Sequence, residues 1–464
     1  MELHKEDAEG WFYRGEGAAN IVLAYQGEKP SFIGRVLRIR KVPKNNKNHN
    51  LDQVKKDSKP VLSVDERKLW REWPSMAMAT TPAALSHVYA ADIMQPLLGE
   101  SCVDAGLPVF LTTGFLEAVN EDVVANQPEW RSKDAVMDLT AGVALLIADH
   151  ASFPTVRGQV NDLPPTITVE LKPKWGCLPE AATISGENNV KLHVSRFTLF
   201  QQLKFQQGKI KSVSKYSPLD LFSGNEEGIL KALVDLFETP QNNIRVFLEG
   251  EEVFGGPVDG GSTDELVTSL EKKLAGVSVA PEGERVPEFQ RLVASALNKS
   301  KVLDQLLRVQ KLDAYDIEGA ILAYKKFMEM TDDADADGVA TTLSRSETRV
   351  ENLALEPDGE HKKRDMAWIE SLSWDESRRV VRNFLISATA KDCGLMITLR
   401  PLNNSHGTPF PVRSASIVTC PTTGQQYICK VALLDLDTKR LKKMPFYHSV
   451  DQEIVDTYKA HRAQ

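Results

Sequence analysis

The sequence of 464 residues is long enough for two or three domains, or for one large two-lobed domain. Its net charge of −8, from 56 Lys and Arg against 64 Asp and Glu, argues against a general nucleic-acid binder, which usually carries a basic domain. Five widely spaced cysteines and the lack of a long uncharged apolar run argue against a disulfide scaffold and a membrane protein.

The N-terminal residues MELHKED are charged and lack the apolar segment of a signal peptide. The low cysteine content also favours a reducing compartment. We therefore expect an intracellular protein that is cytoplasmic, with the nucleus as a further location. Positive charge is concentrated in residues 35–59 and 439–443, so the acidic total still leaves room for a local basic pocket.

Residues 11–42 are expected to form three strands, with a Gly-rich turn between the first two. Such a turn can lie over nucleotide phosphates, although most Gly-x-Gly turns are only turns. No Gly-Lys-Ser/Thr follows, which excludes a Walker A loop. Arg38 stands where a kinase places a cation for the phosphates. A surface arginine whose stem covers apolar neighbours is an equal alternative.

The next elements lead to a possible hinge. Polar residues 43–60 are expected to form a mobile loop, and residues 128–131 a loop that carries Arg131. The composition predicts helices over 64–73 and 83–98 and strands over 107–117 and 143–147. Asp149 and His150 leave the last strand abruptly, where the hinge of a two-lobed kinase would fall.

Residues 167–174 (ITVELKPK) carry a row of charges on a strand. Alternation directs Ile167, Val169 and Leu171 into a core and leaves Glu170, Lys172 and Lys174 on the other face. Pro173 cannot donate to a sheet, so the strand ends or lies open there. Cations at an open strand end suit an anionic ligand, and a solvated charged face is the alternative.

Further along, a helix over 194–204 would align Arg196, Phe200 and Lys204 on one face. The sequence also predicts helices over 226–237, 287–307, 316–328 and 374–390, and strands over 244–248, 394–399 and 427–437. On the last strand, Asp435 and Asp437 would share a face near the strand end. With Asp392 they offer the oxygen ligands that Mg²⁺ prefers, and a solvated strand end is again the alternative.

Residues 331–361 are acidic and polar, so we interpret them as a flexible insertion. Within it, residues 333–338 (DADADG) are similar to the start of an EF-hand loop. The twelfth position of such a loop would be Ser344 rather than Glu, so calcium binding is not expected.

Seven blocks, in order along nearly the whole chain, resemble the inositol-pentakisphosphate 2-kinase family, most closely its plant members. They are residues 13–20 (YRGEGAAN), 169–174 (VELKPK), 195–197 (SRF), 219–224 (LDLFSG), 239–243 (TPQNN), 388–393 (ATAKDC) and 435–437 (DLD) with Lys439. The resemblance implies an α+β, two-lobed, distantly protein-kinase-like fold. Residues 1–150 would be a small β-rich N-lobe with the Gly-rich nucleotide loop and the hinge at its end. Residues 151–464 would be a larger α/β C-lobe with the inositol-phosphate and metal sites.

The same resemblance implies transfer of the γ-phosphate of ATP to the 2-hydroxyl of inositol 1,3,4,5,6-pentakisphosphate, which yields phytate. The positions implied to bind the nucleotide are Arg14, Gly15, Gly17, Asn20, Val22, Arg38, Asp149, His150, Glu170, Arg245 and Met396. Those implied to bind inositol phosphates are Arg131, Lys172, Lys174, Arg196, Lys204, Asn242, Asn243, Lys439, Lys443 and Tyr447. Lys172 would also neutralise the transferring phosphoryl group, Asp392 would accept the hydroxyl proton, and Asp392 with Asp435 would carry Mg²⁺.

Four departures from the family pattern stand out. Phe200 replaces a phosphate-contacting His of the plant relatives, Pro43 falls at a substrate-contacting Arg, and Lys443 also replaces an Arg. In the plant relatives two Cys and two His form a zinc site. Here Leu322 stands at the first His, and residues 331–361 contain no Cys pair. We therefore expect no zinc, because structural zinc sites need four ligands.

Three other functions compete with this interpretation. A non-catalytic inositol-polyphosphate-binding protein would keep the cations without a competent metal site. A protein kinase is disfavoured because no His-Arg-Asp or Asp-Phe-Gly sequence is present. A single-stranded nucleic-acid binder is suggested only by residues 35–59. We expect a monomer whose partners are ATP and inositol pentakisphosphate, with no membrane or nucleic-acid partner.

Overall fold

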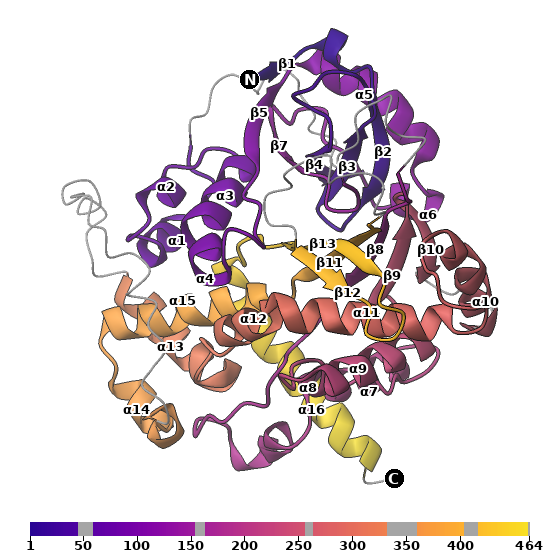
Figure 1. Cartoon of the computed structure of the whole chain (residues 1–464). Coiled ribbons are helices and arrows are strands. Elements are labelled where there is room, and N and C mark those ends of the chain that lie inside the picture. The colour runs from indigo at the N-terminus through magenta and orange to yellow at the C-terminus, as the bar shows by residue number, and fades with distance from the viewer. Residues whose placement is uncertain (45–58, 154–162, 256–262, 332–359, 403–415, 463–464) are drawn as a thin grey trace. The chain divides into compact units, whose positions relative to one another are not determined.

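The computed structural model describes residues 1–44, 59–153, 163–255, 263–331, 360–402 and 416–462 (Figure 1). The chain divides into two compact units, and each contains one β-sheet with helices. The first unit comprises Met1–Leu62, Ser75–Asp92 and Asp104–Leu163, and the second comprises Ser63–Pro74, Ile93–Val103 and Pro164–Gln464. The expected mixture of helix and sheet is confirmed. The loop expected over 43–60 and the insertion expected over 331–361, with its EF-hand-like segment, fall mostly outside the described residues.

The sheet of the first unit has the strand order β1-β5-β7-β4-β3-β2, and β6 pairs with β4 beside this path. Its strands are β1 Glu2–Leu3, β2 Trp11–Glu16, β3 Asn20–Tyr25, β4 Arg35–Pro43, β5 Leu107–Leu111, β6 Ala135–Met137 and β7 Val143–Ala148. The neighbours β2, β3, β4 and β7 pair antiparallel. The three strands expected over residues 11–42, and the one over 143–147, are confirmed.

Helix α5 (Thr113–Asn126) packs on this sheet beside β2. Its Phe115 and Leu116 are buried with alternate strand residues such as Ile21, Leu23 and Leu37. The strand expected over 107–117 is therefore right only as far as Leu111. Thr112 starts the helix because its hydroxyl accepts a hydrogen bond from the Phe115 N–H at 3.3 Å.

Two short helical segments of the chain differ in detail from the expectation. Residues 82–98 are helical as expected, but the run consists of α3 (Pro82–Tyr89), a π-helical turn (Ala90–Met94) and α4 (Gln95–Leu98). Arg131 lies in the short helix α6 (Glu129–Ser132) rather than in a loop.

The sheet of the second unit has the order β10-β9-β8-β11-β13-β12, and every pairing is antiparallel. Its strands are β8 Ile167–Leu171, β9 Ile244–Leu248, β10 Glu251–Gly255, β11 Gly394–Pro401, β12 Ser416–Thr419 and β13 Gln426–Leu434. Strands β8 and β11 lie at the centre and carry buried side chains on both faces. Because β8 is hydrogen-bonded to a strand on each side, the position of the chain where it leaves β8 is well defined.

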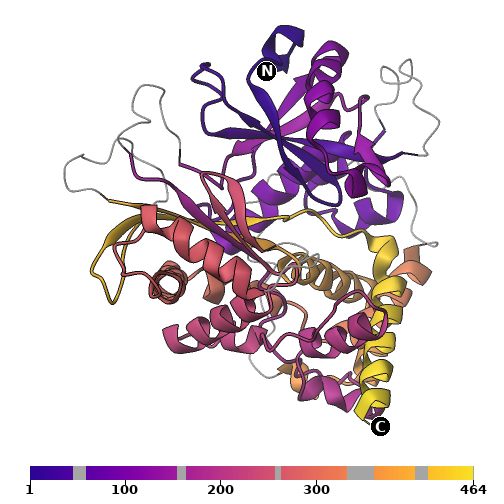
Figure 2. The same cartoon turned by 90° about the vertical axis from the view of Figure 1, so that its right-hand side faces the viewer.

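Helices cover this sheet, and α11 contacts β11, β12 and β13 (Figure 1). The longer helices of the unit are α7 Arg196–Gln206, α9 Glu226–Glu238, α10 Thr263–Lys273, α11 Arg285–Ser300, α12 Val302–Gln310, α13 Asp316–Thr331, α15 Trp374–Ala390 and α16 Met444–Arg462. The helix expected over 287–307 is two helices, because Lys301 adopts a left-handed backbone with φ of 57°. Figure 2 shows α16 at the end of the chain, where it packs against α7.

Among the described residues, no helix has both the length and the apolar character that a bilayer span requires.

Glu72 links an early segment of the second unit to α15. The helix expected over 64–73 ends at Leu69, so Glu72 lies beyond it. Its carboxylate accepts two hydrogen bonds from Arg378, at 2.7 and 2.9 Å, and contacts the fully buried Arg382. Burial alone would raise the pKa of Glu72, but the two guanidinium groups lower it to about 2.

We predict that Glu72→Gln lowers the free energy of unfolding by about 3 kcal/mol near neutral pH, because it removes the carboxylate charge that the buried guanidinium groups of Arg378 and Arg382 share. The folded pKa lies below the ordinary value of 4.5, so this stabilisation is present above about pH 4.5 and is lost as the pH falls towards 2. Urea denaturation of both proteins across this range measures the difference.

The matched control is Glu238→Gln, which breaks an exposed ion pair with Lys215. It should change stability by less than about 0.5 kcal/mol. An equal loss in both variants, or a loss for Glu72→Gln that does not shrink in acid, would contradict the interpretation.

Candidate functional site

Three of the expected nucleotide-binding residues of the first unit lie in one row across its sheet. Gly15 pairs with Val22, and Val22 pairs with Arg38. Directly opposite residues of antiparallel strands point to the same face. The adjacent pair, Ile21 and Ile39, is fully buried on the other face. The Gly15–Val22–Arg38 row therefore faces away from that core.

Arg14 occupies a β-bulge. The pairing of β2 with β3 shifts register between Tyr13 and Gly15, so Arg14 is an extra residue, and a bulge of this kind redirects a side chain. Its guanidinium lies 3.9 Å from the carboxylate of Asp149, which follows β7. That carboxylate also accepts hydrogen bonds from the N–H of Ala151 and the hydroxyl of Ser152. The structure thus brings Arg14 and Asp149 together and holds Asp149 in a fixed turn.

The turn between β2 and β3 is open above its glycines. The N–H of Gly17 donates to the carbonyl of Asn20 at 2.9 Å and closes the turn. A Cβ atom added to Gly15 or Gly17 would meet no other atom of the described chain within 4 Å, and neither residue has a positive φ. Neither packing nor backbone strain within this part of the chain explains the two glycines. Their backbone leaves room for a ligand to approach closely.

His150 and Arg131 complete the expected residues of the first unit. His150 is buried, and its Nε2 lies 3.8 Å from the carboxylate of Asp104. Burial raises the pKa of Tyr13 strongly, whereas the positive charge of Arg131 acts in the opposite direction. Arg131 therefore lies near the strand that carries Arg14.

In the second unit, the other three expected nucleotide-binding residues also share one row. Glu170 on β8 pairs with Arg245 on β9 and with Met396 on β11. Burial raises the pKa of Glu170, and the positive charge of Arg245 counteracts this effect. The register of the sheet thus places side by side three residues that are far apart in the sequence.

The chain leaves the sheet directly after this row. Ile167, Val169 and Leu171 are buried as expected, but β8 ends at Leu171, so Lys172 and Lys174 lie in a turn and not on a strand face. The N–H of Lys172 donates to the carbonyl of Asn243 at 2.8 Å. Lys174 has a φ of 61°, a left-handed conformation that costs free energy for a residue with a side chain and is concentrated at functional sites.

Three lysines gather near Asp392. The pKa of Lys174 is lowered to about 8, mainly by burial and also by the charges of Lys172 and Lys204, while the charge of Asp392 acts in the opposite direction. Burial also lowers the pKa of Lys204, again with a contribution from Lys172 and an opposing one from Asp392. The ammonium groups are therefore close enough to repel one another. This cluster of Lys172, Lys174 and Lys204 with Asp392 is called the lysine cluster below.

Two residues of the C-terminal segment join Asp392. The chain turns after α15, where the N–H of Asp392 donates to the carbonyl of Thr389. The ammonium of Lys439 donates to the Asp392 carboxylate at 2.5 Å. Burial raises the pKa of Tyr447, and the negative charge of Asp392 raises it as well. With 64% of its side chain exposed, Asp392 remains accessible to a ligand.

Asp435 directly follows β13 and lies close enough to Glu170 for its negative charge to raise the pKa of that residue. Strand β13 ends at Leu434 and Asp435 has a φ of 58°, so the expectation that Asp435 and Asp437 share a strand face is wrong. The left-handed residue breaks the alternation of a strand. Burial raises the pKa of the Cys393 thiol to about 12, and the charges of Asp392 and Asp435 both contribute. The two carboxylates therefore flank one buried residue and offer the oxygen ligands that suit Mg²⁺.

Helix α7 presents its cations as the spacing predicts. Arg196 contacts the carboxylate of Asp451 and lies 4.8 Å from the centre of the Trp175 ring. The ammonium of Lys204 lies 4.6 Å from the centre of the Phe200 ring, one turn back on the helix. Neither Trp175 nor Asp451 was expected from the sequence as part of this site. Only the position of Trp175, directly after Lys174, could have pointed to it.

The remaining expected residues differ in exposure. Asn242 is exposed, whereas Asn243 is buried and its side-chain amide donates to Gln241 at 3.1 Å. Lys443 is exposed in a short 3₁₀ helix (Leu441–Lys443). Within the described part of the chain, no hydrogen bond or ion pair joins Asn242 or Lys443 to the lysine cluster, so their role stays a prediction.

A second group of carboxylates lies deeper in the unit. Within the described part of the chain, Asp316, Glu318 and Asp451 are close enough together to resemble a metal site. The buried ammonium of Lys191 contacts all three carboxylates. Burial raises the pKa of Asp316 to about 6, against the positive charge of Lys191. The lysine supplies the positive charge here, so this group is an internal ion cluster.

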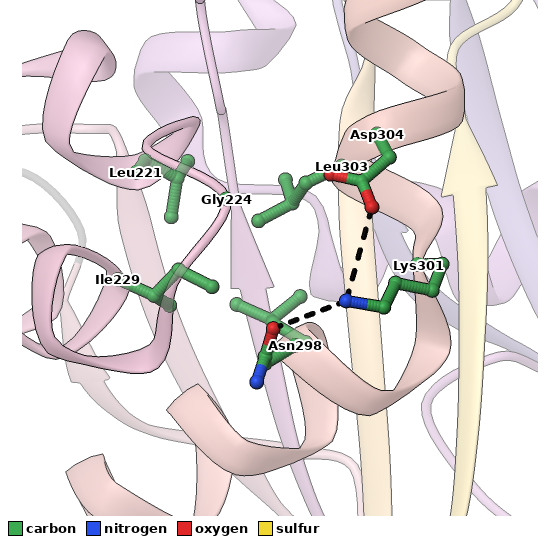
Figure 3. Close-up of a pocket in the computed structure, with 8 residues that line it drawn as sticks. Leu221, Gly224, Ile229, Asn298, Lys301, Leu303 and Asp304 are labelled. Atoms are coloured by element: carbon green, nitrogen blue, oxygen red, sulfur yellow. Dashed lines mark hydrogen bonds and ion pairs between the residues drawn. The ribbon is translucent and has the colours of Figure 1, made fainter.

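The hollow drawn in Figure 3 is not a candidate site. It lies between the region of α8 (Pro218–Leu221) and α9 and the junction of α11 with α12, where Lys301 contacts Asn298 and Asp304. Its lining contains none of the expected site residues, and its space suffices for about one water molecule.

Comparison with known proteins gives a consistent result. The family model described as inositol-pentakisphosphate 2-kinase matches residues 13–453. A protein named inositol-pentakisphosphate 2-kinase from Arabidopsis thaliana is 37% identical over 463 residues, which cover 99% of this chain and 95% of the relative. A protein of the same family name from Oryza sativa subsp. indica is 38% identical over 457 residues, with 98% and 95% covered. A relative of that name from Danio rerio is 27% identical over 513 residues. The chain therefore belongs to the inositol-pentakisphosphate 2-kinase family.

We predict that the amine of Lys174 titrates near pH 8, because burial and two neighbouring ammonium groups disfavour its charged form. It is then protonated below about pH 8 and neutral above. Reductive ¹³C-methylation followed by NMR titration measures this directly. Exposed lysines should titrate above about pH 10. The NMR signal that titrates near pH 8 should disappear in Lys174→Arg, which assigns it to Lys174. If the Lys174 signal instead titrates in the same pH range as the exposed lysines, the prediction is wrong.

Proposed function

We propose that this member of the inositol-pentakisphosphate 2-kinase family transfers the γ-phosphate of ATP to the 2-hydroxyl of inositol 1,3,4,5,6-pentakisphosphate, which forms inositol hexakisphosphate (phytate). The observation that carries the proposal is the lysine cluster around an accessible Asp392. A small polyanion of high charge density needs several fixed cations in one pocket. Such a pocket is compatible with a chain whose total charge is −8.

The proposed nucleotide-binding residues come from both units. In the first unit they are Arg14, Gly15, Gly17, Asn20, Val22, Arg38, Asp149 and His150, and in the second unit Glu170, Arg245 and Met396. The two cross-strand rows and the open Gly turn support this assignment. We further propose that the two units correspond to the N-lobe (1–150) and C-lobe (151–464) of a distantly protein-kinase-like fold. Residues 63–74 and 93–103 belong to the second unit although they precede that boundary.

The proposed inositol-phosphate ligands are Arg131, Lys172, Lys174, Arg196, Lys204, Asn242, Asn243, Lys439, Lys443 and Tyr447. The gathering of Lys172, Lys174, Lys204, Lys439 and Tyr447 about Asp392 supports five of them. Lys439 now pairs with Asp392. A substrate phosphate would compete for this ammonium and so release the carboxylate at the moment when the hydroxyl arrives.

In the proposed reaction, the 2-hydroxyl oxygen attacks the γ-phosphorus, the bond from that phosphorus to the bridging oxygen breaks, and ADP leaves. Asp392 accepts the hydroxyl proton, and Lys172 neutralises charge on the transferring phosphoryl group. Phosphoryl transfer depends mainly on alignment and charge neutralisation, which fixed cations and carboxylates provide. Asp392 and Asp435 would hold Mg²⁺, which supplies further positive charge to the phosphates.

The alternative is a non-catalytic protein that binds inositol polyphosphates on the same fold. The accessible Asp392 and its neighbour Asp435 favour catalysis, because binding alone would not require carboxylates beside the cations. That the protein needs no zinc, acts as a monomer and works inside the cell remain parts of the proposal.

We predict that Asp392→Asn lowers kcat by about 10²- to 10⁴-fold, the usual contribution of a general base. Binding of inositol pentakisphosphate should persist, because the lysines remain and lose only a competing negative charge. Phosphorus NMR measures the conversion to hexakisphosphate, and calorimetry measures binding. Wild-type protein that binds but does not turn over would establish the non-catalytic alternative. Unchanged turnover in Asp392→Asn would show that another group accepts the proton.

We predict that Phe200→His lowers the KM for inositol pentakisphosphate by about tenfold, because an imidazole restores a donor that a phenyl ring lacks and a charge-assisted hydrogen bond contributes about 1–3 kcal/mol. Phe200→Leu is the matched control. It removes the contact with the Lys204 ammonium without adding a donor, so its KM should rise slightly. Equal increases of KM in both variants would show that position 200 acts only through Lys204.

A further inference from the structure

Gln310 lies at the end of α12 and is fully buried. Its side-chain oxygen accepts a hydrogen bond from the N–H of Gly176 at 2.8 Å. Its side-chain nitrogen donates to the carbonyl of Lys174 at 2.8 Å and to that of Ala390 at 3.2 Å. One side chain therefore bonds to the backbone of two segments more than two hundred residues apart: the turn after β8 and the end of α15.

Both segments carry residues of the lysine cluster. Lys174 provides one ammonium, and Ala390 stands two residues before Asp392. Bonds on either side of Trp175 hold the left-handed backbone of Lys174, whose φ is 61°. Gly176 fits the turn because a Cβ there would lie 2.3 Å from the Phe222 ring. The turn cannot move away from Gln310 without losing these bonds.

Three further contacts reinforce the same link. The carbonyl of Gln310 accepts a hydrogen bond from the Ser387 hydroxyl at 2.5 Å. Asp313, just beyond α12, forms a buried ion pair with Lys391 at 2.6 Å. The Lys391 ammonium in turn lies 4.0 Å from the centre of the Trp175 ring. The end of α12 is thus bonded to both segments, and the two segments also contact each other.

We propose that Gln310 is a positioning residue, which fixes the backbone that carries Lys174 relative to the backbone that carries Asp392. Gln310 itself touches neither substrate nor reacting atoms. Its amide suits this role because it can accept from one segment and donate to two carbonyls, which neither a carboxylate nor an aliphatic side chain can do. The inference rests on the proposed function, which makes Asp392 the base and Lys174 a ligand of the inositol phosphate.

The test is Gln310→Met, which keeps the length and bulk of the side chain and removes all three hydrogen bonds. We expect kcat to fall by about 10- to 100-fold, since small displacements of reacting groups cost this much. The KM for ATP should stay within about twofold, because Gln310 contacts none of the proposed nucleotide residues. Steady-state kinetics with both substrates give these values, and thermal unfolding gives the loss of stability.

The matched control is Tyr427→Phe. The buried Tyr427 hydroxyl donates to the carbonyl of Val277 at 3.0 Å, at the opposite end of β13 from Asp435. Its loss should lower the unfolding temperature without changing kcat. A wild-type kcat in Gln310→Met, or a kcat loss that Tyr427→Phe reproduces at equal destabilisation, would overturn the proposal.

Two more variants separate the possible failures. If Gln310→Met does not fold, Gln310→Glu replaces it in the test. This variant keeps the acceptor for the Gly176 N–H and loses the donor to the two carbonyls. Its kcat should fall by the same factor, and an unchanged kcat would contradict the proposal. Asp392→Asn in the same assay tests the premise. Wild-type turnover in that variant would show that another group accepts the proton, and it would overturn this inference, whose premise is that Asp392 is the base. Loss of turnover there, with full activity in both Gln310 variants, overturns the inference alone.

Discussion

Mutual repulsion among the ammonium groups of Lys172, Lys174 and Lys204 is the constraint that the second unit must satisfy. Burial makes this repulsion stronger, because fewer water molecules screen the charges. The fold holds the groups together through three parts of the backbone: β8 at the centre of the sheet, the left-handed backbone at Lys174, and helix α7, which carries Lys204. Asp392 offsets part of the repulsion. The remaining repulsion is a free-energy cost of folding, and any anion at this position would lower that cost.

The fold was predictable where the chain follows local rules. Alternation of Ile167, Val169 and Leu171 predicted the buried face of β8, and the Ser195-led helical spacing predicted α7. The predictions failed where one residue changes the backbone. Thr112 caps a helix inside an apolar run, Lys301 splits a helix, and Asp435 ends a strand. Left-handed lysine and aspartate give no warning in a single sequence, because most such residues have ordinary backbones.

The residues of the candidate site also fall into those that could be predicted from the sequence and those that could not. Residues inside short motifs, such as Glu170, Lys172 and Asp392, could be named from the sequence because the motif resembles a family. Residues that act by contact across the fold could not. Lys191, Asp316, Asp451 and Gln310 belong to no motif, and long stretches of sequence separate them from the residues that they contact. Their pairing depends on which helices pack together, and spacing along the chain carries no information about that.

The C-terminal helix α16 has a consequence for how the protein is made. It brings Tyr447 to Asp392, and one turn later Asp451 contacts both Lys191 and Arg196. These partners come from the middle of the chain and are synthesised long before α16. Until α16 is synthesised, Lys191 can pair only with Asp316 and Glu318, and Arg196 lacks its carboxylate partner, so the ion cluster and α7 can reach their final arrangement only after Asp451 has emerged. A product truncated before Asp451 would therefore leave the Arg196 guanidinium without this counter-charge.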